Sequence, residues 1–211
     1  MKKTEMNADG RADMKRGFQR VYQFKINLNG IRPPVWRRIQ VPETYTFWDL
    51  HVAVQDAMGW LDYHLHCFEI VNPITGLGEE IGIPNEDWQT ECLAGWDEQI
   101  KIWFSPENAM AQYTYDFGDD WQHTVKLEKI LKKDDGARYP RCIAGKRACP
   151  PEDCGGVWGY QHFLDAIMDP THKEYEELLD WVGGDFDPEY FDISEIHFDN
   201  PTGRLKIDDL F

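Results

Sequence analysis

The sequence predicts an α+β fold in which one main helix packs on a mixed or antiparallel sheet. Three observations lead to this prediction: an alternating apolar pattern near the start of the chain, a helical period over 47–58, and a second alternating pair around a Gly-Asp turn at 118–119. The order along the chain is strand, strand, helix, strand and then a hairpin, which is similar to the β-grasp order. A C-terminal helical extension follows.

Two strands are predicted first, at 21–28 and 35–41. In the first, every second residue is apolar: Tyr22, Phe24, Ile26 and Leu28. Asn29-Gly30 is a typical hairpin turn. Because prolines stand at 33, 34 and 42, the second strand is expected at an edge of the sheet.

The main helix is predicted over 47–58, where apolar residues recur at helical spacing. Thr46 is a good N-cap, Asp49 lies in the first turn and Gly59 is a natural stop. These local signals define both ends of the helix.

The remaining elements follow from the same rules. A strand is predicted at 65–71, then an irregular stretch over 72–98, and another strand through Ile100, Ile102 and Phe104. A hairpin pairs 112–117 with 121–130. Beyond it, one amphipathic helix covers 160–168, and a second begins at a capping box of Thr171 and Glu174 and stops at Gly183-Gly184. We therefore expect a flexible tail at 1–20, a sheet core at 21–131, and a cysteine-containing loop with helical extension at 137–211, packed on the core.

Composition limits the class of protein. The chain has 211 residues, 42% of them hydrophobic, which excludes a disordered chain. Its net charge of −16 argues against a general nucleic-acid binder, although the basic segment Lys132–Arg147 leaves local DNA association as a weaker hypothesis. No apolar run is long enough to span a membrane. Five cysteines cannot all pair in disulfides, so we expect a reduced, cytoplasmic protein. The sequence does not determine the oligomeric state.

Three cysteines, Cys142, Cys149 and Cys154, lie in a loop rich in Pro and Gly. Three thiols that converge, with a histidine as fourth ligand, would suit a structural Zn²⁺ ion. The spacing is not Cys-x2-Cys, and buried cysteines commonly serve only as small apolar side chains. Zinc binding and simple packing both remain open.

Histidines and aspartates form a second candidate centre. His64 and His66 are two apart, so on a strand they would share one face and hold one metal ion. Asp116, Asp119 and His123 surround the predicted hairpin turn. If the two groups converge, they would form the centre of a metal-dependent hydrolase, for example one of a phosphodiesterase or nuclease type. The alternative is that the turn explains the aspartates and that the histidines belong to the core.

A third candidate is the segment Trp36-Arg37-Arg38, predicted at an exposed edge. Trp and Arg are typical anchors of protein interfaces, and the chain contains nine tryptophans but no complete catalytic constellation. The leading hypothesis is therefore a non-catalytic interaction or regulatory module with a protein partner. The metal-dependent hydrolase is the alternative.

Several segments together resemble the plasmid pRiA4b ORF-3-like family. The matching motifs are Pro34–Arg38 with Val41-Pro42, Leu50-His51, Gln55–Trp60, His64–Phe68, Tyr115–His123, Ala148–Gly156 and Gly159-Tyr160. The resemblance spans about residues 20–200. It implies an uncharacterised protein associated with plasmid or mobile-element genes, and it places the Cys and His motifs within the family's recognisable segments.

Overall fold

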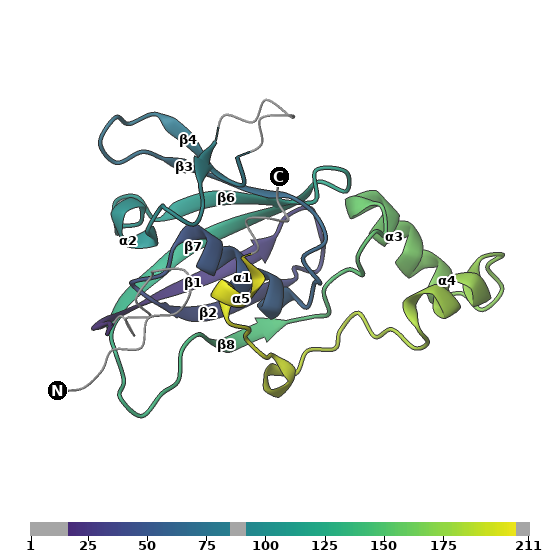
Figure 1. Cartoon of the computed structure of the whole chain (residues 1–211). Helices are drawn as coiled ribbons and strands as arrows, with labels where there is room; N and C mark the ends of the chain where they lie inside the picture. Colours follow the sequence, from purple (N-terminus) through teal and green to yellow (C-terminus); the bar gives the residue numbers. More distant parts are fainter. Residues whose placement is uncertain (1–16, 85–91, 206–211) are drawn as a thin grey trace.

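The structure, a computed structural model, describes residues 17–84 and 92–205. At its centre is an eight-stranded sheet with the order β5-β4-β3-β6-β7-β1-β2-β8 (Figure 1). The strands are β1 (Arg20–Leu28), β2 (Trp36–Pro42), β3 (His66–Val71), β4 (Gly78–Gly82), β5 (Leu93–Ala94), β6 (Met110–Tyr115), β7 (Trp121–Lys132) and β8 (Arg141–Lys146). The helices are α1 (Phe47–Met58), α2 (Ile100–Trp103), α3 (Gly156–Ile167), α4 (Tyr175–Val182), a 3-10 turn at Ile193–Glu195, and α5 (Pro201–Arg204). The predicted α+β class is confirmed.

One face of the sheet forms the core with α1. In β7 the residues at 121, 123, 125 and 127 are buried, while those between them face outward. The central strand β1 pairs antiparallel with both β7 and β2, and only the short β4–β5 pair is parallel. An antiparallel sheet can leave one face in water, and the alternation in β7 shows that this sheet does so.

Local chemistry defines α1 as predicted. The Thr46 hydroxyl accepts from the Asp49 N–H at 3.2 Å, and the Asp49 carboxylate accepts from the Thr46 N–H at 2.9 Å, which completes a capping box. Gly59 ends the helix with φ of 91°. The side chains of this helix are buried along most of its length.

The expected edge position of the second strand is wrong. β8 pairs with β2 over Trp36–Gln40 and forms that edge of the sheet instead. The segment 137–211 therefore contributes a strand as well as the expected loop and helices. β8 has no apolar alternation of its own, because its residues are only half-buried or exposed. Its partner strand determines its conformation.

Other elements also differ from expectation. The stretch predicted as irregular over 72–98 contains β4 and β5, and its residues 85–91 lie outside the described part. Ile100–Trp103 is a helical turn rather than a strand, since Ile100, Trp103 and Phe104 are buried at helical spacing. The second C-terminal helix, α4, has Glu174 as its N-cap residue, and no side chain caps it there. The Thr171 hydroxyl instead donates to Asp169 at 2.8 Å. Of the predicted tail at 1–20, only 17–20 are described.

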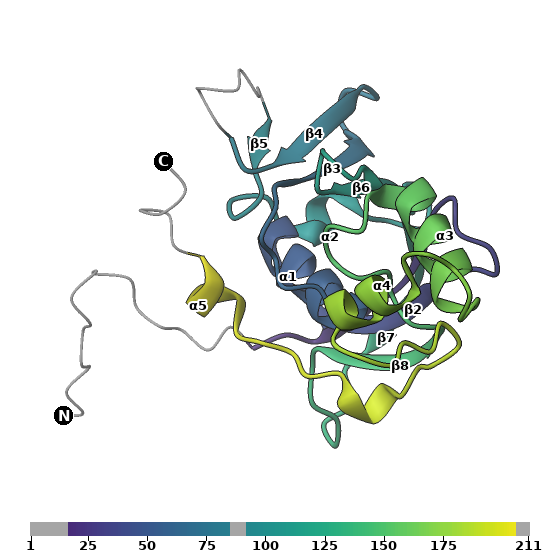
Figure 2. The same cartoon turned by 90° about the vertical axis from the view of Figure 1, so that its right-hand side faces the viewer.

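The C-terminal part leaves the sheet and returns to it. α3 and α4 extend from one end of the molecule and face the viewer in Figure 2. The chain then runs back to α1, where the Trp48 indole donates to the Pro201 carbonyl at 3.0 Å and Arg204 pairs with Asp56 at 2.6 Å. In the described ranges, no helix is both long and apolar enough to cross a membrane.

Candidate functional site

Three loops distant in sequence meet near the end of the sheet that carries α3. They are the loop before β3 (59–65), the turn between β6 and β7 (116–120), and the segment before α3 (148–155). Backbone and side-chain hydrogen bonds join them: Asp116 N to Leu65 O at 2.9 Å, Leu61 N to Glu152 at 2.7 Å, and Gly155 N to Asp119 at 3.0 Å. The positions of these loops are therefore fixed relative to one another.

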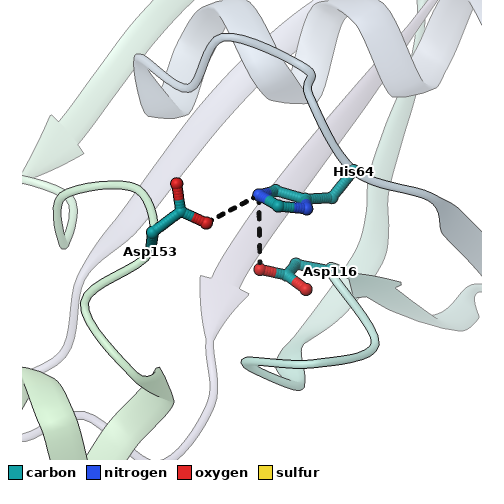
Figure 3. Close-up of side chains that lie close together, drawn as sticks. All are labelled: His64, Asp116 and Asp153. Atoms are coloured by element: carbon teal, nitrogen blue, oxygen red, sulfur yellow. Dashed lines mark hydrogen bonds and ion pairs between the residues drawn. The ribbon is translucent and has the colours of Figure 1, made fainter.

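His64, Asp116 and Asp153 lie together where these loops meet (Figure 3). The His64 Nε2 atom is 2.8 Å from an Asp153 oxygen and 3.6 Å from an Asp116 oxygen. One donor atom from each residue lies within 4.8 Å of the other two. Among the described residues this is the group of His, Cys, Asp and Glu side chains close enough to hold a metal ion.

The Asp116 carboxylate is held in place by its own turn. Its Oδ1 accepts from the N–H groups of Gly118 at 2.9 Å and Asp119 at 3.3 Å. Asp116 adopts a left-handed φ of 55°, which Asp tolerates because its short side chain bonds to the local backbone. The other oxygen, Oδ2, is the one that faces His64.

Glu152 lies next to this group. Its carboxylate accepts from the Leu61 N–H and, at 3.2 Å, from the Tyr115 hydroxyl. Burial raises the pKa of Glu152 above its ordinary value. The Trp60 ring stacks on Tyr115 with centroids 5.0 Å apart, and its indole donates to the Pro150 carbonyl at 2.9 Å. Trp60 thus joins β6 to the Pro-rich loop.

A cavity of about 470 Å³ lies between these loops and α4. Its lining is mostly apolar, with Glu152 as its acidic group: Met58, Gly59, Trp60, Leu61, Cys149, Pro150, Pro151, Glu152, Trp181, Val182 and Phe186. Trp181 of α4 is 47% exposed. An apolar cavity of this size beside a few polar groups is the usual form of a binding site.

The other predicted histidines lie in the core. His66 is buried and stacks on His51, and burial lowers its pKa well below the ordinary value. The His123 Nδ1 atom lies 3.2 Å from the Tyr113 carbonyl, and burial lowers its pKa to about 4. His64 and His66 do not share a strand face, because β3 begins only at His66.

Of the predicted cysteines, Cys142 lies on β8, and Cys149 and Cys154 lie on the segment before α3. Cys142, Cys149 and Cys154 are free and pack against the core. Burial raises the pKa of all three thiols. No metal-binding group that includes a cysteine occurs in the described part of the chain. Zinc binding by these thiols stays a prediction, and the geometry agrees better with their packing role.

Trp36, Arg37 and Arg38 do not form one exposed patch. Side chains alternate across a strand, so Arg37 points to the opposite face from its two neighbours. Arg37 is 3% exposed and donates to the carbonyls of Ala57, Trp36 and Lys146. Arg38 forms a two-bond ion pair with Glu128 on the open face, where it also lies over the Trp36 ring.

Asp153, Glu152 and Trp181 were not identified from the sequence as site residues. Asp153 has a left-handed φ of 56° next to Cys154 and Gly155, but such a turn does not predict that it meets His64. Asp119, which was expected to act chemically, binds the Gly155 N–H. It therefore links the β6–β7 turn to the loop before α3.

Fold and site together define an α+β protein with an apolar cavity beside a His–Asp group at the end of its sheet. The chain belongs to the plasmid pRiA4b ORF-3-like protein family, whose model matches residues 20–195. It is 34% identical over 181 residues to uncharacterized protein y4hQ of Sinorhizobium fredii (strain NBRC 101917 / NGR234), covering 84% of this chain and 89% of that one. It is also similar to the crystal structure of protein of unknown function MM3350 from Methanosarcina mazei Go1, with a TM-score of 0.81 and 51% identity. That match covers 86% of this chain and all of the other.

Proposed function

We propose that this protein is a non-catalytic interaction module that binds a basic segment of a partner protein in the cavity between α4 and the Pro-rich loop. The observation that supports this proposal is the mostly apolar lining of the cavity, which includes the half-exposed Trp181. Tryptophans in such positions commonly anchor a partner's side chain.

The charge of the chain and of helix α4 favours a basic partner. The chain has a net charge of −16, and residues 150–211 contain sixteen acidic side chains but three basic ones. On α4, the helix that carries Trp181, the exposed residues include Glu176, Glu177 and Asp180. Complementary charge accelerates encounter and selects the partner, while the apolar cavity supplies affinity.

The cellular setting is part of the same proposal. Five free cysteines are typical of a reducing compartment, which supports the cytoplasm. The family description refers to a plasmid, which supports a regulatory role beside plasmid or mobile-element genes.

The hydrolase alternative has less support. It requires His64, His66, Asp116, Asp119 and His123 around one ion. Only His64 and Asp116 belong to the metal-competent group among the described residues, and Asp153 joins them. His66 and His123 are buried in the core.

The test is a selection of random displayed peptides against the full-length protein. We expect enriched sequences that combine Lys or Arg with one or two large apolar residues. Affinities of the synthetic peptides, measured by fluorescence anisotropy, should weaken at least tenfold in Trp181→Ala and also weaken as salt is raised.

Trp158→Ala is the matched control. Trp158 lies on α3, is 87% exposed and does not line this cavity, so its removal should leave affinity unchanged. Peptides that bind Trp181→Ala as tightly as the wild type, or a selection that enriches nothing, would refute the proposal.

A further inference from the structure

The cluster of His64, Asp116 and Asp153 has a donor set that the interaction function does not use. We infer that these three side chains form a binding site for one divalent transition-metal ion, with Zn²⁺ as the probe ion. The inference concerns a different set of side chains from the peptide-binding cavity and does not depend on that proposal.

The donor atoms suit such an ion. One imidazole nitrogen and two carboxylate oxygens lie within 4.8 Å of one another. Zn²⁺ bonds of about 2.0–2.2 Å require these atoms to approach to roughly 3–3.5 Å of each other. The His64–Asp153 and His64–Asp116 distances of 2.8 and 3.6 Å are already close to that range. The mixture of imidazole and carboxylate favours a borderline ion over Ca²⁺ or Mg²⁺, which prefer oxygen ligands alone.

The site is held in position before an ion arrives. The Oδ1 atom of Asp116 is engaged by two N–H groups of its own turn, which leaves Oδ2 toward His64. The Asp116 N–H donates to the Leu65 carbonyl next to His64, and Gly155, two residues after Asp153, donates to the Asp119 carboxylate. All three ligand-bearing loops are therefore linked, and a site with fixed ligands loses less entropy on binding.

Asp153 is the ligand whose side chain can most easily move to fit the ion. Its side chain is 63% exposed, so it can move without disturbing the core. Three protein ligands leave at least one coordination position open to water or to a donor from a bound molecule. Closed structural zinc sites use four protein ligands, so this centre is of the open kind.

The experiment uses full-length protein freed of metal by a chelator that is then removed. Zn²⁺ is titrated by calorimetry, and Tm is followed in parallel. We expect one Zn²⁺ per chain and a rise in Tm on binding. His64→Ala and Asp153→Asn should each weaken Zn²⁺ at least tenfold. Asp153→Asn removes one exposed carboxylate charge, and far-UV circular dichroism confirms that both variants fold.

Two controls make the result specific. His162 pairs with Glu174 at 2.8 Å on the surface outside this cluster, so His162→Ala removes a comparable His–carboxylate pair and should leave affinity unchanged. The Cys142/Cys149/Cys154→Ser variant should also retain Zn²⁺. Binding that survives in His64→Ala but is lost in the cysteine variant, or no binding up to millimolar Zn²⁺, would overturn the inference.

Discussion

The imidazole of His51 lies flat against that of His66, with ring centroids 3.4 Å apart and ring planes 7° from parallel. His51 is bound on both sides, by Asp62 at 2.7 Å and by the Tyr113 hydroxyl at 2.8 Å. Both ring nitrogens of His66 lack a hydrogen-bond partner in the described structure. Burial without any hydrogen-bond partner disfavours the charged form of His66 and lowers its pKa, so this part of the core favours a neutral His66 ring.

Acid should destabilise the protein below neutral pH through its buried histidines. The pKa of His123 falls from 6.5 to about 4 on burial, and that of His66 also falls. Because the folded pKa lies below the unfolded one, the stabilisation is complete above pH 6.5 and is lost as pH falls toward 4. For His123 alone, the free energy of unfolding should drop by roughly 2 kcal/mol between pH 7.5 and 5. Urea unfolding at pH 7.5 and at pH 5 measures this change in the free energy of unfolding.

His123→Gln is the control for this pH dependence. The amide can still donate to the Tyr113 carbonyl but does not titrate. The difference in unfolding free energy between pH 7.5 and 5 should therefore be smaller in the variant. An unchanged difference would show that His123 does not contribute to acid sensitivity.

Arg37 and Arg38 should differ in their contribution to stability. Arg37→Met leaves carbonyls of α1, β2 and β8 without their donor, and we expect a loss of about 3 kcal/mol. Arg38→Met breaks a partly exposed ion pair with Glu128 and should cost about 1 kcal/mol. Urea denaturation gives both values. Equal losses would contradict the assignment of Arg37 to the interior.

Gly156 should tolerate no side chain. A Cβ there would lie 2.3 Å from the Asp119 carbonyl oxygen, and its φ is 67°. The Asp119 oxygen belongs to the backbone and cannot rotate away as a side chain could. Gly156→Ala should therefore lower the free energy of unfolding by more than about 2 kcal/mol. A Cβ at Gly203 meets nothing within 4 Å, so Gly203→Ala should change Tm little. Similar Tm values for the two variants would argue against the close approach of Gly156 and Asp119.

The thiols should be unreactive in the folded protein. Burial raises the pKa of all five cysteines, and the thiolate is the reactive form. Iodoacetamide at pH 7.5 should therefore modify the native protein far more slowly than the urea-unfolded protein, as followed by intact mass. Rapid modification of one native cysteine would identify an accessible thiolate and contradict this.

The elements that the sequence predicts well are those with local signals. Thr46, Asp49 and Gly59 define α1 by contacts within a few residues of one another. β8 was missed because its strand conformation comes from β2, about a hundred residues earlier. The run Ile100, Ile102 and Phe104 predicts a strand but forms a helical turn, because so short a run fits both the strand period and the helix period. Only its packing in the fold distinguishes the two.

The candidate site was predictable only in part. His64 and Asp116 were named because their residue types suit metal chemistry. Asp153 lies in the cysteine loop, and no local pattern connects it to His64, 89 positions earlier. The prediction that Trp36, Arg37 and Arg38 form one exposed patch is wrong for a local reason. Side chains alternate across a strand, so Arg37 lies on the opposite face from its two neighbours.

The pairing of β1 with β7 has a consequence for synthesis. Arg20 of β1 aligns with Lys132 of β7, and Leu28 aligns with His123. The pairing of these two strands therefore cannot form until β7 has left the ribosome, about a hundred residues after β1. At usual translation rates, roughly 5 to 20 s pass while those hundred residues are made. During that time the nascent β1–β2 hairpin has an unpaired, largely apolar edge, which is the form that chaperones recognise and that aggregates when chains are crowded.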